Sequence, residues 1–115
     1  STEQATRERP ATPKIAWVGR GADGGLTARI LSMGRLHHAF TGTGAIALAV
    51  AARLPGSLVQ EITGSDDAEL CFAHASGRMT LGAEIAQREG QWRMVASEVG
   101  RSARRLMQGW LPLPV

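Results

Sequence analysis

The sequence has too few cysteines for a disulfide framework and too short an apolar run for a membrane span. Cys71 is the only cysteine in 115 residues, so a disulfide within the chain is excluded and a reducing, cytoplasmic location is expected. The longest nearly pure apolar run, Ala45–Ala52, has eight residues, whereas a helix needs about 20 to cross a bilayer. Ser1–Thr12 is polar and has no apolar core segment, so we expect neither a signal peptide nor a membrane partner.

Lysine is also nearly absent. Lys14 is the only lysine among 13 basic residues, and ten acidic residues leave a formal net charge of +3. A small positive excess favours acidic partners, but it is far from the dense basic stripe of a nucleic-acid-binding protein. We therefore interpret the cluster of Arg101, Arg104 and Arg105 as a solvated face, and no nucleic-acid partner is expected.

The remaining composition is that of one globular domain. Apolar residues make up 43% and charged residues 20% of a chain whose length suits a single domain. Ser1–Pro13 carries two prolines and no periodicity, so residues 1–12 are expected to be a flexible arm or linker and 13–115 the domain. The first residue is Ser and not Met, which indicates a processed chain or a piece of something longer.

Hydrophobic patterning predicts an α+β domain. Apolar residues three or four positions apart, at Leu26, Ile30, Met33 and Leu36, with Arg29 and Arg35 between them, predict a short amphipathic helix over Leu26–Leu36. A loop is expected at Gly19–Gly25 and a turn at Gly64–Asp67. Strands are expected at Lys14–Val18, Ser57–Thr63, Glu69–His74, Arg78–Ile85 and Gln91–Val99.

The most informative segment is Thr41-Gly42-Thr43-Gly44, followed by the apolar run Ala45–Leu54 and by Pro55-Gly56. Thr41 or Thr43 can cap a helix here, because a threonine oxygen accepts a hydrogen bond from a free backbone N–H. A helix without charge before Arg53 is expected to be buried on every face. Two glycines before a positive helix end form a turn that can bind carboxylate or phosphate. The alternative is a helix cap without a ligand.

Three other groups of residues carry side chains that could bind a metal or take part in catalysis. On a helix, His37 and His38 would point about 100° apart, so they are poor joint metal ligands and no metal site is predicted. His74-Ala75-Ser76-Gly77 is a polar cluster at a strand end and resembles a plain turn more than a site. Cys71 lies among apolar neighbours and is expected to be a core thiol.

Four segments, in order, resemble one known family. Phe40-Thr41-Gly42-Thr43-Gly44-Ala45 is similar to the A-C-G-[TS]-G-[AS] signature of the diaminopimelate epimerase fold, with Thr41 in place of its catalytic cysteine. Ser32-Met33-Gly34 and His37-His38-Ala39 narrow the resemblance to the PrpF family. His74–Gly77 resembles its H-P-S-G motif, with Ala75 replacing proline. Arg101–Trp110 resembles its closing R-[ST]-A-R-x-[LI]-M-x-G segment.

The resemblance implies that the chain is one of the two domains of an enzyme. PrpF members include 2-methylaconitate and 3-methylitaconate isomerases and 4-oxalomesaconate tautomerases, built from two similar domains around a cleft. This chain resembles the C-terminal domain, a mixed or antiparallel sheet wrapped around a buried central helix. The family's proton-transferring lysine lies in the other domain, and Lys14 is not at a matching position. The closing segment is a strand in that fold, so Arg101–Leu113 is expected to be extended.

The implied activity is a 1,3-proton shift on an unsaturated di- or tricarboxylate without a cofactor. The expected partners are this small molecule and either the missing domain or a second copy of the chain. Thr41 is the candidate catalytic residue, acting by binding or polarisation because it lacks a paired base. The substrate-binding candidates are Gly42, Thr43, Gly44, Ala45, His37, His38, Ser32, Met33, Gly34 and Ser76. The alternative is a carboxylate-binding or interaction module that has lost catalysis.

Overall fold

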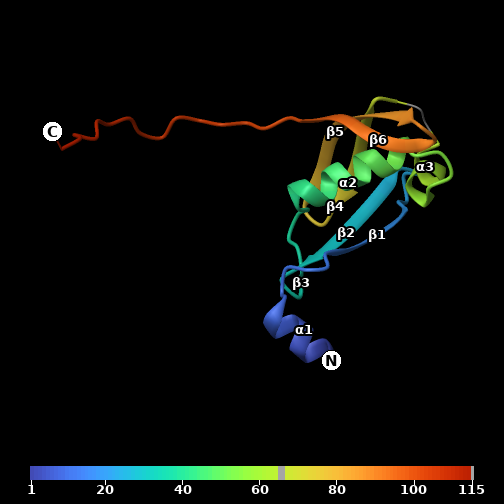
Figure 1. Ribbon diagram of the computed structural model, residues 1–115, viewed down its shortest axis with the longest axis horizontal. Coiled ribbons are helices and arrows are strands. Elements are labelled where there is room, and N and C mark those ends of the chain that lie inside the picture. The colour runs from blue at the N-terminus through green and yellow to red at the C-terminus, as the bar shows by residue number, and fades with distance from the viewer. Residues whose placement is uncertain (65–66, 115) are drawn as a thin grey trace.

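The computed structural model describes residues 1–64 and 67–114, and its helices and strands confirm an α+β fold (Figure 1). The helices in this part of the chain are α1 (Thr2–Glu8), α2 (Gly42–Arg53) and α3 (Leu58–Thr63). The strands are β1 (Ile15–Arg20), β2 (Leu26–Ser32), β3 (Arg35–Leu36), β4 (Glu69–His74), β5 (Gly77–Arg88) and β6 (Gln91–Val99). None of the described helices is long and apolar enough to span a membrane.

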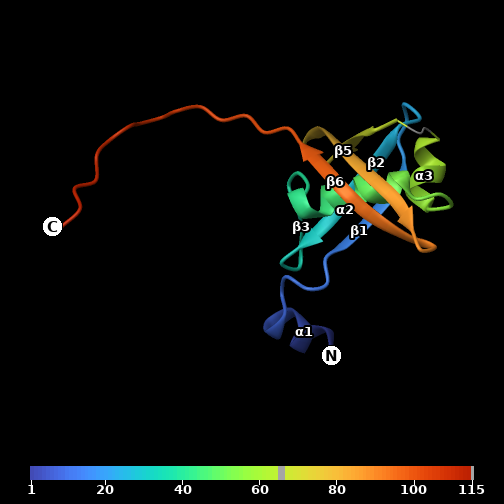
Figure 2. The ribbon, with the colours of Figure 1, turned by 45° about the horizontal axis from the view of Figure 1, so that its top comes forward.

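The strands form one mixed sheet in the order β1-β2-β4-β5-β6, with β3 paired to β2. All pairs are antiparallel except β2 with β4, where Leu26 lies opposite Phe72. The two strands run in the same direction but overlap only at Leu26–Thr27 and Phe72–Ala73, so the end of β4 lies beside the start of β2. The sheet curves around α2, which lies on its concave side (Figures 1 and 2). The expected mixed sheet is confirmed.

Helix α2 begins where the glycine-threonine turn predicts and packs against β4, β5, β6 and α3. Its buried residues are Ala45, Leu48, Ala49 and Ala52. The expectation of burial on every face is wrong, because Thr43 and Ala47 are exposed. The sheet covers one side of α2 and leaves the side that carries Thr43 and Ala47 open.

The predicted helix at Leu26–Leu36 is wrong, because this segment forms the hairpin of β2 and β3. Leu26, Ala28 and Ile30 are buried at every second position, which is the period of a strand. Met33 and Gly34 turn the chain with φ of 55° and 74°. The apolar residues at helical spacing therefore belong to two strands and the turn between them.

The predicted strand at Ser57–Thr63 is also wrong, because these residues form α3. The Ser57 hydroxyl oxygen accepts a hydrogen bond from the Gln60 amide at 3.1 Å and caps the helix. Gly64 ends it in the left-handed conformation with φ of 61°. The expected turn at Gly64–Asp67 lies partly outside the described residues.

The remaining strands agree with the predictions. β1 begins within the expected segment but continues through Gly19 and Arg20, which were assigned to the loop. β4 and β6 have the predicted bounds, and β5 is longer by Gly77 and by three residues at its end. The loop before β2 is correspondingly shorter than Gly19–Gly25.

Both ends of the chain lie away from the core. Residues 1–12 were expected to be irregular, but Thr2–Glu8 form α1, capped by Ser1, with no buried residue. The segment 101–114 is not helical, as expected, but it pairs with no strand in the described part of the chain and extends away from β6 (Figure 2). Its large apolar side chains are exposed: Leu106, Met107, Trp110, Leu111 and Leu113.

Candidate functional site

The turn before α2 offers two free backbone donors. The Thr41 hydroxyl oxygen accepts a hydrogen bond from the Gly44 amide at 3.2 Å, so Thr41 and not Thr43 is the helix cap. The Ala45 amide donates to the Thr41 carbonyl oxygen at 2.9 Å. The amides of Gly42 and Thr43 have no acceptor within the described ranges, and both residues are exposed. Of the four amides expected to bind an anion, the structure therefore leaves two available.

The structure adds Lys14, which sequence reasoning missed. Its Nζ donates to the Thr43 hydroxyl at 3.3 Å across 29 positions of sequence. Lys14 directly precedes β1, whose pairing with β2 brings it to the start of α2. No local motif signals this contact, because it depends on how the sheet and α2 pack together.

Gly44 is required by close packing. A Cβ atom there would lie 2.6 Å from Ile30 Cδ1, 2.7 Å from Thr41 Oγ1 and 3.2 Å from Phe40 Cε1. Gly42 is different, because a Cβ atom there would meet nothing within 4 Å. The two glycines that sequence reasoning treated alike therefore have different roles.

The His74–Gly77 segment is the turn between β4 and β5, as expected. The His74 Nδ1 atom accepts a hydrogen bond from the Ser76 amide at 3.3 Å, and Ser76 is exposed. The His74 ring contacts Phe72, and Phe72 contacts Phe40 edge to face with centroids 5.0 Å apart. These ring contacts connect the His74 turn to Phe40, the residue before Thr41. In the described structure no hydrogen bond joins Ser76 to the Thr41–Gly44 turn.

His37 and His38 are not on a helix, contrary to the assumption made from sequence. They follow β3, and their rings stack with centroids 4.6 Å apart. The His37 Nδ1 atom accepts from the Ala39 amide at 3.1 Å, and the His37 amide donates to the Ile30 carbonyl at 2.9 Å. These bonds shape the connection from the sheet to α2. Within the described ranges no three His, Cys, Asp or Glu side chains are placed to share a metal ion.

The candidates Ser32, Met33 and Gly34 lie at the β2–β3 turn. Ser32 ends β2 opposite Arg35, and the Met33 side chain is 58% exposed. Met33 and Gly34 line a separate groove toward α1. In the described structure no hydrogen bond connects them to the Thr41 turn, so the structure does not bring them into that group.

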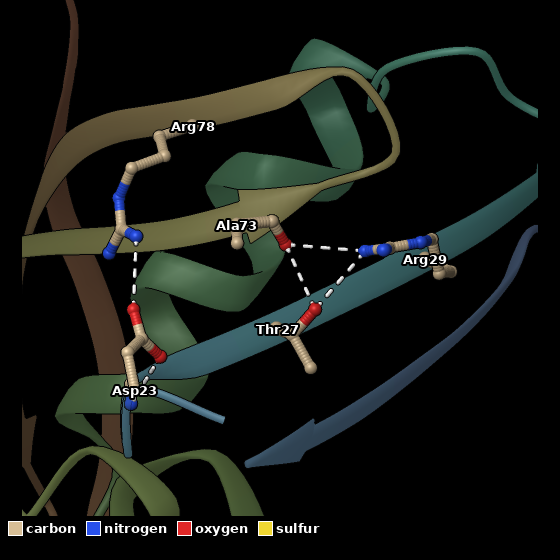
Figure 3. A network of polar contacts seen from close by, with 6 residues as sticks. Asp23, Thr27, Arg29, Ala73 and Arg78 are labelled. Carbon is tan, nitrogen blue, oxygen red and sulfur yellow. Dashed lines mark hydrogen bonds and ion pairs between the residues drawn. The ribbon is translucent and has the colours of Figure 1, made fainter. Parts of the chain in front are cut away.

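A second polar network lies at the other end of β2 (Figure 3). The Arg78 guanidinium pairs with the Asp23 carboxylate at 3.2 Å. On the β2–β4 pair, Arg29 Nη1 donates to the Thr27 hydroxyl at 3.1 Å and to the Ala73 carbonyl at 3.5 Å. The Arg29 contacts join β2 to β4, and the Asp23–Arg78 pair joins the loop before β2 to β5.

Cys71 is exposed, so the prediction of a core thiol is wrong. In β4 the buried positions are Leu70 and Phe72, and the alternation of a strand turns Cys71 to the opposite face. Hydrogen bonds from Thr80 and then Arg78 hold the pKa of the Cys71 thiol below its ordinary value.

We expect the Asp23–Arg78 contact to make stability depend on pH. The hydrogen bond from the Gly25 amide, at 3.0 Å, and then the Arg78 guanidinium hold the pKa of the Asp23 carboxyl below its ordinary value of 3.8. A lowered folded-state pKa stabilises the protein above the unfolded-state pKa, and this contribution is lost as pH falls through the folded-state value. The D23N variant should therefore be less stable than the wild type at pH 7, and the difference should shrink below about pH 4.

Urea unfolding at pH 7 and pH 3, followed by circular dichroism, measures this difference. R78Q is the matched control: it removes the partner charge and should lower stability at pH 7 in the same sense. A difference between D23N and wild type that is equal at both pH values would contradict the expectation.

Comparison with known proteins identifies the family. The pattern of the PrpF protein family matches residues 1–114, so the chain belongs to the PrpF family. It is 40% identical to the 2-methyl-aconitate isomerase of Cupriavidus necator over 93% of this chain and 31% of that protein. It is 39% identical to the 2-methyl-aconitate isomerase of Shewanella oneidensis over 97% of this chain and 31% of that protein.

A solved structure agrees with this assignment. The crystal structure of methylitaconate-delta-isomerase matches with a TM-score of 0.71 and 26% identity, covering 95% of this chain and 31% of that one. The chain therefore spans about 31% of the length of the relatives it matches. The resemblance to the PrpF family is confirmed.

Proposed function

We propose that this chain supplies a carboxylate-binding part of a PrpF isomerase with a diaminopimelate epimerase-like fold. The reaction is a 1,3-proton shift, without a cofactor, on an unsaturated di- or tricarboxylate such as 2-methylaconitate or 4-oxalomesaconate. The observation that carries the proposal is the pair of unoccupied amides, Gly42 and Thr43, at the start of α2 in a chain of this family. A cytoplasmic location stays a prediction.

The site performs the electrostatic share of the reaction. The Gly42 and Thr43 amides and the positive end of α2 hold one substrate carboxylate. When a base removes a proton from the neighbouring carbon, negative charge spreads into this carboxylate, and the fixed donors stabilise it. One preorganised donor of this kind contributes about 3 kcal/mol to transition-state stabilisation. The proton then returns two carbons away.

Thr41 is a binding residue in this proposal and not a base. Its oxygen already accepts the Gly44 amide, which leaves its hydroxyl hydrogen to donate to the substrate. No carboxylate or imidazole in the described structure pairs with this hydroxyl, and general-base catalysis needs such a partner. The resemblance assigns proton transfer to a lysine in the other domain. His37 or His38 is the candidate for the distal carboxylate.

Titration with citrate tests the site. We expect the amide NMR signals of Gly42 and Thr43 to shift most, and those of Gly44 and Ala45 less, because the latter amides are already bonded within the chain. Affinity should be in the millimolar range, or about −4 kcal/mol, because an open site supplies few contacts. T41S should bind like the wild type, and T41A should bind more weakly.

Signals of Gly42 and Thr43 that stay constant at high citrate would contradict the proposal and leave the turn as a helix cap. T41A also loses the cap, which costs about 1 kcal/mol. Its folded fraction is therefore checked by circular dichroism under the same conditions before binding is compared.

A further inference from the structure

A groove of about 320 Å³ lies between β1 and α2, and Thr43, one of the two residues with a free amide, lines it. Its volume is at the lower end of the range of about 300–1,000 Å³ that small-molecule sites occupy. Lys14 and Thr43 stand at its polar end. Apolar side chains form the rest: Ala16, Ile30, Ala47 and Leu48.

The apolar part of the groove is lined by two buried and two exposed side chains. Ile30 and Leu48 are 2% and 7% exposed and form the floor. Ala16 and Ala47 are exposed and small, so they leave the space above this floor unfilled. A methyl or alkenyl group could contact this floor without displacing any side chain.

The polar end carries an uncompensated positive charge. The Lys14 ammonium lies 3.3 Å from the Thr43 hydroxyl, close to the positive end of the α2 dipole. No acidic residue occupies the first turn of α2, and the only ion pair in the described part of the chain joins Arg78 to Asp23. A cation at a helix N-terminus is unfavourable by itself, and an anion between the two would reverse the sign of this interaction.

We propose that the groove binds the alkyl or alkenyl part of a small carboxylic acid whose carboxylate bridges Lys14 and the Gly42–Thr43 amides. Lys14 is then a substrate-binding residue, and the floor of Ile30 and Leu48 recognises the branch beside the carboxylate. This inference rests on the proposed function, because both use the same amides. It adds the orientation of the ligand and a preference for a branched acid over an unbranched one.

Succinate and methylsuccinate form a matched pair of probes, because they carry the same charges and differ by one methyl group. We expect methylsuccinate to bind the 115-residue chain about fourfold more tightly, which is the effect of burying one such group. Both acids should shift the Gly42 and Thr43 amides. Only methylsuccinate should strongly shift the methyl signals of Ala47 and Leu48.

Two variants separate the parts of the site. K14M should weaken both acids by roughly tenfold through loss of a charged hydrogen bond, and K14R should retain most of the affinity. A47L fills the groove and should remove the preference for methylsuccinate while succinate still shifts the amides. Urea unfolding of each variant confirms that the chain remains folded.

Equal affinities of the two acids, or K14M binding like the wild type, would overturn the inference. If the amides still shift in that case, the proposed function stands without the groove. If neither acid nor citrate shifts the amides, the proposed function fails and the inference fails with it.

Discussion

The G44V variant should be strongly destabilised, by about 3 kcal/mol or more. A Cβ atom at position 44 would lie 2.6 Å from Ile30 Cδ1 and 2.7 Å from Thr41 Oγ1, closer than real Cβ contacts. Ile30 is 2% exposed, so displacing its side chain, even toward the groove between β1 and α2, disrupts packed contacts of the core. Overpacking of a core costs about 1–3 kcal/mol, and displacement of the Thr41 cap adds about 1 kcal/mol.

G42A is the matched control, because it changes a glycine in the same turn of α2. A Cβ atom at position 42 meets nothing within 4 Å, so G42A should change stability by less than about 1 kcal/mol. Urea unfolding followed by circular dichroism measures both variants. Similar stabilities for G44V and G42A would contradict the prediction that a side chain at position 44 collides with Ile30 and Thr41.

From sequence alone, both glycines were expected to form a turn that binds an anion. The structure places both inside α2, and neither is among the glycines with positive φ. The turn was found because its residue types are distinctive. The need for a glycine at position 44 was not predicted. It depends on the contact with Ile30 from β2, and from sequence Ile30 was expected to lie in a helix.

The errors in secondary structure have local physical causes. In Leu26–Leu36, Ala28 is buried but small, so it contributes little to the apolar pattern of a strand. Met33 lies in the hairpin turn and Leu36 in the next strand, and their spacing from Ile30 coincides with that of a helix. In Ser57–Thr63 a signal was present and overlooked. Ser57 followed by Gln60 is a capping pair, and Gly64 supplies the helix end.

The candidate site could be predicted only where it is local in sequence. Thr41, Gly42 and Thr43 form one turn, so a motif is enough to find them. Lys14 reaches that turn through the pairing of β1 with β2 and the packing of α2, which no spacing rule encodes. Ser32–Gly34 and Ser76 were carried over with the resemblance, and hydrogen bonds within the described residues do not tie them to the turn.

The 115-residue chain by itself should not isomerise 2-methylaconitate. A 1,3-proton shift needs a base that removes a proton from carbon and an acid that returns it. In the described structure the side chains that hydrogen-bond within the turn are the Thr41 and Thr43 hydroxyls and the Lys14 ammonium, which are not bases for a proton on carbon. His37 uses its Nδ1 atom to accept the Ala39 amide, and within the described residues no hydrogen bond joins His37 or His38 to the turn. Donors that stabilise the charge do not replace the base that removes the proton, so no turnover should be detected under conditions where a complete isomerase converts the substrate.

Proton NMR of the methyl and vinyl signals of the substrate measures this directly, and the 2-methyl-aconitate isomerase of Cupriavidus necator under the same conditions is the positive control. The comparison also separates carboxylate binding from catalysis. A chain that binds citrate but gives no turnover supplies a carboxylate-binding part of the site, and the base lies elsewhere. Turnover by the chain would contradict the prediction. Loss of that turnover in K14R as well as in K14M would then show that Lys14 takes part in proton transfer, because arginine keeps the positive charge but does not release its proton. Lys14 is the first residue to test, because its Nζ lies 3.3 Å from the Thr43 hydroxyl.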